Sequence, residues 1–187
     1  RSILQLAAEN QLKESDLVIL GVSPESKLIE FESFAAIEVF LETHKIEIDE
    51  KYKATIDKIK AMPVSERFAF WMEELEPCFK CYACRAACPL CYCPKCTVEN
   101  NQPQWIPAAS HLLGNLEWHV MRAMHLAGRC TDCEACYTAC PMGIPIHLLT
   151  KSMLQDVEEH FGPYGPSVGK QNTLSSFNPD DKESFIR

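Results

Sequence analysis

The chain of 187 residues is acidic and rich in cysteine, with a formal net charge of -8, 47% hydrophobic residues and 11 cysteines. Its 18 basic residues argue against nucleic acid as the main partner, because neutralising phosphates requires a concentrated cationic face. The apolar runs, such as residues 17–22, are far shorter than the roughly 20 residues of a membrane span, and no signal-peptide pattern occurs, so the sequence predicts a soluble, cytoplasmic protein without a membrane span.

Residues 1–62 carry the pattern of a partial α/β segment followed by connecting helices. Apolar spacing predicts a helix over residues 3–14, and the apolar run of residues 17–22 predicts a strand buried on both faces. Helices are predicted over residues 27–43 and 49–62. Because a single strand cannot pair with itself, the other strands of its sheet are expected in sequence upstream of Arg1 or in a partner.

Three longer helices and a tail follow. Helices are predicted over residues 65–77, 113–127 and 145–161, and Gly128 supplies the stop for the second. The apolar stripe expected to face inward on that helix comprises Leu113, Leu116, Val120, Ala123, Met124 and Ala127. Residues 163–187 have few apolar anchors and are expected to form an extended tail.

All 11 cysteines fall between residues 78 and 140, and eight of them repeat one pattern. Cys-x-x-Cys-x-x-Cys-x-x-x-Cys-Pro occurs at residues 78–89 and again at residues 130–141. Such spacing indicates metal binding, and in bacterial ferredoxins the fourth cysteine of each run ligates the cluster of the other run. The sequence therefore predicts one 4Fe-4S cluster held by Cys78, Cys81, Cys84 and Cys140, and a second held by Cys130, Cys133, Cys136 and Cys88. Two zinc sites are the alternative, since four thiolates also bind zinc.

Cys91, Cys93 and Cys96 lie outside the repeated pattern. They are candidates for a third metal centre, iron–sulfur or zinc, completed by a histidine, a partner cysteine or a residue upstream. The alternatives are free thiols in a turn, or a different ligand set for the nearby cluster. A histidine close to a cluster can ligate it or shift its potential, but His111, His119 and His125 do not share one helix face, and each is expected to be an ordinary helix residue.

Residues 63–161 resemble the α-helical ferredoxin domain found in iron–sulfur subunits of succinate dehydrogenase and of heterodisulfide reductase. The likeness rests on the doubled cysteine pattern and on the long stretch between Cys88 and Cys130, which is expected to be helical. Four short motifs are similar to beta subunits of deazaflavin-reducing hydrogenases and formate dehydrogenases and to sulfhydrogenase beta subunits: RFAFW at residues 67–71, CYACR at 81–85, CPLCYC at 88–93 and HLAGRC at 125–130.

This resemblance implies a mainly α fold, in which an α-helical ferredoxin dicluster domain over residues 63–162 follows the fragment of an incomplete α/β domain. It implies a subunit without catalytic residues that relays single electrons through two 4Fe-4S clusters within an anaerobic oxidoreductase complex. Partners of this kind are formate dehydrogenase, hydrogenase, aldehyde oxidoreductase or a heterodisulfide-reductase-like flavoprotein. The alternative is a flavin-containing beta subunit, with FAD in upstream or partner sequence, that itself oxidises or reduces a deazaflavin or nicotinamide.

Overall fold

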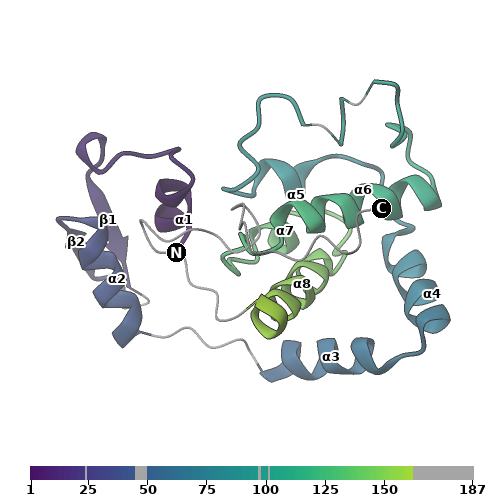
Figure 1. Ribbon diagram of the computed structural model, residues 1–187, viewed down its shortest axis with the longest axis horizontal. Coiled ribbons are helices and arrows are strands. Elements are labelled where there is room, and N and C mark those ends of the chain that lie inside the picture. The colour runs from purple at the N-terminus through teal and green to yellow at the C-terminus, as the bar shows by residue number, and fades with distance from the viewer. Residues whose placement is uncertain (24, 45–49, 97, 101, 162–187) are drawn as a thin grey trace, which may run out of the picture.

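The chain folds mainly into α helices in the computed structural model (Figure 1). The structure describes residues 1–23, 25–44, 50–96, 98–100 and 102–161. The only sheet within these residues has two strands. None of the helices in the described part of the chain combines the length and the apolar composition needed to cross a lipid bilayer. The tail predicted over residues 163–187 lies outside the described residues, and the division at residues 62 and 63 stays a prediction.

The N-terminal part is a small body at the left of Figure 1. It consists of helix α1 (Ser2–Ala8), strands β1 (Ile19–Val22) and β2 (Leu28–Phe31), and helix α2 (Phe34–Thr43), with one 3₁₀ turn (Glu14–Asp16) before β1. The strands pair antiparallel, with Ile19 opposite Phe31. The core of this body contains Leu4, Ala7, Ile19, Phe34 and Ile37.

Four expectations for this part were wrong. Residues 28–31 form a strand, not the start of a helix, and they pair with β1 within the chain, so one partner strand does not have to come from elsewhere. Helix α2 begins later because the Ser33 hydroxyl caps it, accepting a hydrogen bond from the backbone N–H of Ala36 at 3.1 Å. Strand β1 is not buried on both faces, since Val22 is 73% exposed. Helix α1 ends at Ala8, and Asn10 then turns the chain with φ 58°.

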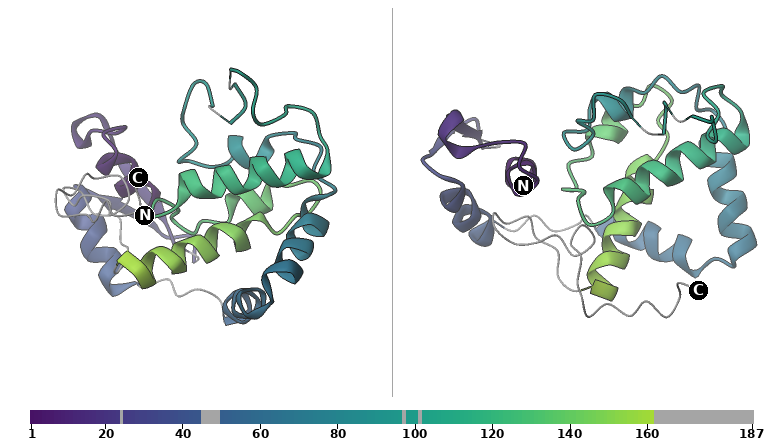
Figure 2. Two further views of the ribbon diagram at one scale, coloured as in Figure 1. Left: turned by 45° about the vertical axis from the view of Figure 1, so that its right-hand side comes forward. Right: turned by 45° about the horizontal axis from the view of Figure 1, so that its top comes forward.

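The larger body is built on four helices, α3 (Glu50–Ala61), α4 (Val64–Leu75), α6 (Leu112–Leu126) and α8 (Ile146–Phe161). Helix α6 packs against α4 and α8, and α3 packs against α8. Figure 2 shows α4 on the side of this body away from the N-terminal part. The predicted helices over residues 65–77, 113–127 and 145–161 correspond to α4, α6 and α8, and Gly128 follows α6 with φ 65°. Residues 89–111, expected to be helical, contain no helix where they are described.

The buried face of α6 is the main departure from the predicted packing. In the expected stripe Ala123 and Ala127 are buried and Leu116 packs against the core, but Leu113, Val120 and Met124 are exposed. The buried side also contains Asn115, Trp118, His119 and Arg122. The buried side faces the cysteine loops, where polar groups find partners. The Asn115 side-chain amide, for example, donates to the carbonyl oxygen of Cys78 at 2.7 Å. This helix therefore presents hydrogen-bonding groups to the cysteines beside its buried apolar residues.

Candidate metal centres

The two cysteine runs fold into two copies of one loop. Lys80 and Tyr82 have φ of 55° and 59°, and the matching residues Asp132 and Glu134 have φ of 59° and 56°. A one-turn helix follows each loop, α5 (Ala83–Ala86) and α7 (Ala135–Thr138). A non-glycine residue in the left-handed region costs roughly 1–2 kcal/mol. Because this costly conformation occurs at the same positions in both runs, the two loops are expected to form the same kind of binding site.

The loops direct backbone N–H groups at cysteine sulfur. The N–H of Lys80 donates to Cys78 Sγ at 3.4 Å, and the N–H of Asp132 hydrogen-bonds Cys130 in the same way. Helices α5 and α7 contact each other, so the two runs lie face to face. This geometry brings the fourth cysteine of each run to the cysteines of the other.

One cavity is lined by Cys78, Cys81 and Cys84 of the first run and by Cys140 of the second. It contains about 340 Å³ of empty space, including the part open to solvent, and apolar side chains such as Trp118 complete its wall. The structure thus brings together the four residues that the sequence groups as the first ligand set.

A second cavity is lined by Cys130, Cys133 and Cys136 of the second run and by Cys88 of the first. It contains about 400 Å³ of empty space, again including the part open to solvent, and Arg122 forms part of its wall. The second predicted ligand set therefore also surrounds one space.

In each cavity the four thiols line one common space. Among the described residues, no three Cys, His, Asp or Glu side chains are placed to hold a single metal ion. Zinc–sulfur bonds of about 2.3 Å would hold four thiolates within roughly 4 Å of one another. A cubane cluster offers each thiolate its own iron, so its ligands stand farther apart. Both cysteine sets supply the four thiolates that a cubane cluster requires.

Burial raises the pKa of the Cys84 and Cys130 thiols to about 11. A hydrogen bond from Cys91 lowers the pKa of Cys88, while the same bond raises the pKa of Cys91. Because metals bind thiolates, loading these cavities releases protons and is favoured as the pH rises.

His119 lies against the first ligand set, although the sequence suggested an ordinary helix residue. It is 1% exposed, and its Nε2 lies 3.3 Å from Cys78 Sγ. Burial lowers the pKa of His119 to about 4, so the ring is neutral at pH 7 and can donate an N–H to the sulfur. The sequence does contain a signal for this arrangement. Asn115, His119 and Arg122 are separated by four and three residues, which places their side chains on one face of a helix. His111 instead caps α6, with Nδ1 accepting from the N–H of Gly114 at 3.2 Å.

Arg122, which sequence reasoning missed, places a positive charge among the cysteines. It is 4% exposed, and its Nη2 donates to the carbonyl oxygen of Cys84 at 3.0 Å, while Nε and Nη1 have no hydrogen-bond partner. Burial alone would lower the pKa of Arg122, but the thiolates of Cys84, Cys91 and Cys88 outweigh that effect and raise it. The side chain therefore stays cationic beside groups that become anionic on metal binding.

Lys151 of α8 forms ion pairs with the second loop. Its ammonium pairs with Asp132 and with Glu134 Oε1, the latter at 2.9 Å, and lies 4.9 Å from the centre of the Tyr52 ring. The Lys151 side chain is 2% exposed. Its two carboxylate partners are the left-handed residues of the second loop, so this ion pair fixes the costly backbone.

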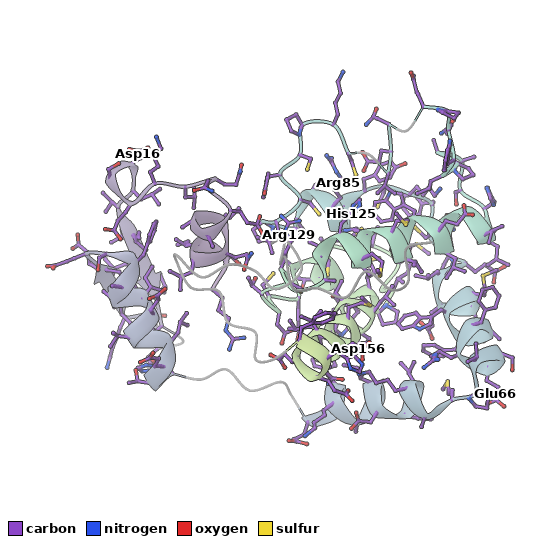
Figure 3. All side chains as sticks on the ribbon, viewed as in Figure 1. Asp16, Glu66, Arg85, His125, Arg129 and Asp156 are labelled. Carbon is purple, nitrogen blue, oxygen red and sulfur yellow. The ribbon has the colours of Figure 1, made fainter. Side chains whose placement is uncertain are left out.

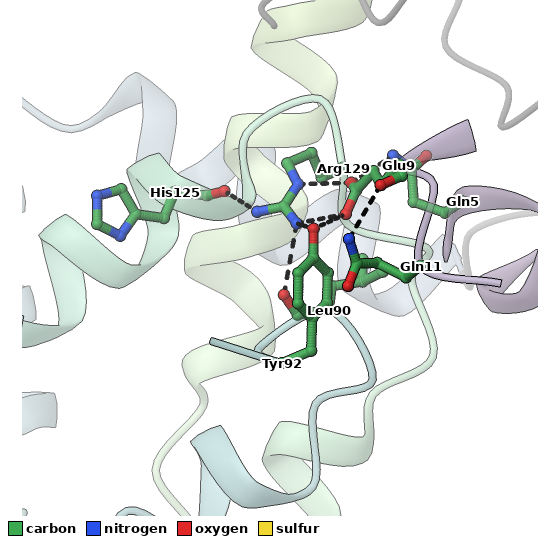
Figure 4. Close-up of polar contacts among 7 residues, drawn as sticks. All are labelled: Gln5, Glu9, Gln11, Leu90, Tyr92, His125 and Arg129. Atoms are coloured by element: carbon green, nitrogen blue, oxygen red, sulfur yellow. Dashed lines mark hydrogen bonds and ion pairs between the residues drawn. The ribbon is translucent and has the colours of Figure 1, made fainter. Parts of the chain in front are cut away.

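Arg129 joins the N-terminal body to the cysteine loops (Figure 4). Its guanidinium contacts both carboxylate oxygens of Glu9, at 2.6 and 2.5 Å, and donates to the Tyr92 hydroxyl at 3.3 Å. Tyr92 in turn donates to Glu9 at 2.8 Å. One side chain at the end of α6 thus holds both the region after α1 and the segment that carries Cys91 and Cys93.

The three additional cysteines line a third cavity. Cys91, Cys93 and Cys96 line it together with His125 of α6. The structure therefore places all three beside the predicted clusters' cavities but outside the two ligand sets.

No family model matches this chain. A curated protein of Methanocaldococcus jannaschii, F420-dependent formate dehydrogenase subunit beta, is 33% identical to it over 99 residues, which are 52% of this chain and 25% of that protein. The chain thus spans about a quarter of the length of this relative.

Proposed function

We propose that this chain is an electron-transfer subunit of an oxidoreductase complex and that it relays single electrons through two 4Fe-4S clusters. The observation that carries the proposal is the crosswise lining of the two cavities, in which each contains three cysteines of one run and the fourth cysteine of the other. The relative's name supports a formate dehydrogenase complex as the setting. A hydrogenase, an aldehyde oxidoreductase or a heterodisulfide-reductase-like flavoprotein would provide the same kind of partner.

The protein contributes ligands, shielding and charge to this relay. Cys78, Cys81, Cys84 and Cys140 would hold one cluster, and Cys130, Cys133, Cys136 and Cys88 the other; such clusters supply one-electron oxidation and reduction when bound. The N–H of Lys80 donates a hydrogen bond to Cys78 sulfur, the ring of His119 would donate another once that sulfur is a thiolate, and buried apolar side chains such as Trp118 limit water. Hydrogen bonds to sulfur and exclusion of water both set the reduction potential.

Metal analysis of the full chain, purified without oxygen, tests the proposal. We expect iron and acid-labile sulfide in equal amounts and, after reduction, electron paramagnetic resonance signals of two magnetically interacting 4Fe-4S clusters. Zinc as the only metal would contradict the proposal. Stoichiometric flavin, with electron transfer that depends on it, would instead favour a beta subunit that itself oxidises or reduces a deazaflavin or nicotinamide.

Arg122→Gln is expected to lower the reduction potentials of both clusters, because reduction adds negative charge that the buried guanidinium stabilises. Two unit charges in a protein interact by roughly 4 kcal/mol at 4 Å and less at longer range, and for one electron about 59 mV is a tenfold change in equilibrium. We therefore expect shifts of roughly 50–100 mV, measured by redox titration with spectroscopic detection.

The control for this variant is Lys53→Gln, which removes the same charge from an exposed position of α3. Solvent and salt screen such a charge, so its potentials should stay at the wild-type values. Equal shifts in both variants would contradict the specific role of Arg122.

A further inference from the structure

The cavity of the additional cysteines adjoins both proposed clusters. It contains about 780 Å³ of empty space, including the part open to solvent. Its wall shares Leu90, Arg122 and Leu126 with the second cavity and Trp118 with the first. A redox group in this space would therefore be separated from each of the two proposed clusters by single side chains.

The segment that carries the three thiols is fixed by a side chain from α5 and by another from the turn after α6. Arg85 of α5 donates from Nη2 to the Cys93 carbonyl oxygen at 2.8 Å and pairs with Glu99 at 3.3 Å. At the other end, Arg129 lies over the Tyr92 ring, 5.7 Å from its centre. Figure 3 shows Arg85, His125 and Arg129 near one another, far from Glu66 and Asp156. The thiols are thus held on an anchored backbone and not on a free turn.

Arg122 points to an anionic occupant. It lines this cavity as well as the second one, it is 4% exposed, and two of its nitrogens have no hydrogen-bond partner. A buried cation with unpaired donors is costly unless an opposite charge lies nearby. Metal-bound thiolates would supply that charge.

The neighbouring cysteines Cys88 and Cys91 divide between the two cavities. Cys88 lines the second cavity, whose four-cysteine set is complete, and Cys91 lines the cavity of Cys93 and Cys96. The Cys91 thiol contacts Cys88 through a hydrogen bond, but the second set already has four cysteines without it.

We propose that Cys91, Cys93 and Cys96 hold a third iron–sulfur cluster, with the ring of His125 as the fourth ligand. The inference rests on the proposed electron-transfer function and extends it. A cluster is preferred to zinc because these side chains border a large space that adjoins the cavities of both proposed clusters. Cys93 and His125 are exposed, so a redox partner can reach this cluster directly from solvent. Each exchange oxidises one cluster and reduces its neighbour by one electron, with no bond made or broken.

The double variant Cys93→Ser/Cys96→Ser tests the site in the full chain purified without oxygen. We expect it to lose about a third of its iron and sulfide relative to the wild type, because one of three equal clusters is removed. The signals of the other two clusters should persist, which shows that the variant folds.

Variants of His125 test the fourth ligand separately. A histidine ligand raises the potential of an iron–sulfur centre relative to cysteine, so His125→Cys should keep the iron and lower the potential of the third signal. His125→Ala should lose or broaden that signal. The control is His160→Ala, an exposed residue near the end of α8, which should match the wild type.

The outcomes separate this inference from the proposed function. If the wild type and the double variant contain the same iron and show the same two signals, the third cluster is excluded and the relay stands. If the double variant loses zinc instead of iron, the cluster at this site is also excluded. A wild-type chain without any iron would exclude both proposals.

Discussion

Replacing Cys140 with serine is expected to cause the same loss of iron and the same spectroscopic change as replacing Cys84, although the two residues belong to different runs. Both line the first cavity, so either change removes a ligand of the same proposed cluster. Replacing Cys136, which lines the second cavity, should remove the other cluster and leave the first signal in place. Iron analysis and low-temperature electron paramagnetic resonance on the three variants provide the measurement.

The comparison distinguishes crosswise ligation from ligation within each run. If each run held its own cluster, Cys140→Ser would resemble Cys136→Ser and not Cys84→Ser. Thr138→Ser is the control, because Thr138 is exposed within the second run and lines neither of the two cavities. Unchanged iron content in Cys84→Ser and Cys136→Ser would overturn the ligand assignment altogether.

The grouping of cysteines was accessible from the sequence because the spacing repeats, and the bacterial ferredoxin pattern supplies the crosswise assignment. Repetition of one pattern at residues 78–89 and 130–141 suggested two sets of four, and the structure places each set around one cavity. That the sets bind iron stays a prediction. The helices α4, α6 and α8 were also predictable, since each has continuous helical spacing and α6 has a clear stop at Gly128.

The orientation of α6 could not be predicted from apolar spacing. That rule assumes burial against an apolar core, whereas α6 packs its polar side against cysteine loops, whose carbonyls and sulfurs accept hydrogen bonds from Asn115, His119 and Arg122. Strand β2 was missed for a different reason. Leu28 and Phe31 fit helical spacing, but pairing with β1 decides their conformation, and pairing is not encoded locally.

Lys151→Met is expected to lower the free energy of unfolding by about 3–5 kcal/mol, because it leaves a buried carboxylate without its counter-charge. The side chain of Asp132 is 8% exposed and that of Glu134 is 31% exposed, so Asp132 carries most of the penalty. The matched control is Lys60→Met. Lys60 pairs with Asp156 at 2.6 Å, but these side chains are 28% and 42% exposed, and a surface pair contributes only about 0–1 kcal/mol. Chemical denaturation of both variants measures the difference, and equal losses would contradict the structural role of Lys151.

The pH dependence provides a second measure of the same interaction. Burial alone would lower the pKa of Lys151, but hydrogen bonds to Asp132 and Glu134 outweigh it and raise the pKa above its ordinary value. A lysine with a raised folded-state pKa contributes stability that is complete below the unfolded-state pKa of about 10.4 and is lost as the pH rises through the folded-state pKa. Wild-type protein should therefore lose stability above about pH 10 more steeply than Lys151→Met.

Because Asp132 and Glu134 shape the second loop, the Lys151→Met variant should also release the second cluster's iron before the first cluster's iron. Simultaneous release would show that Lys151 acts on the whole fold and not on this loop.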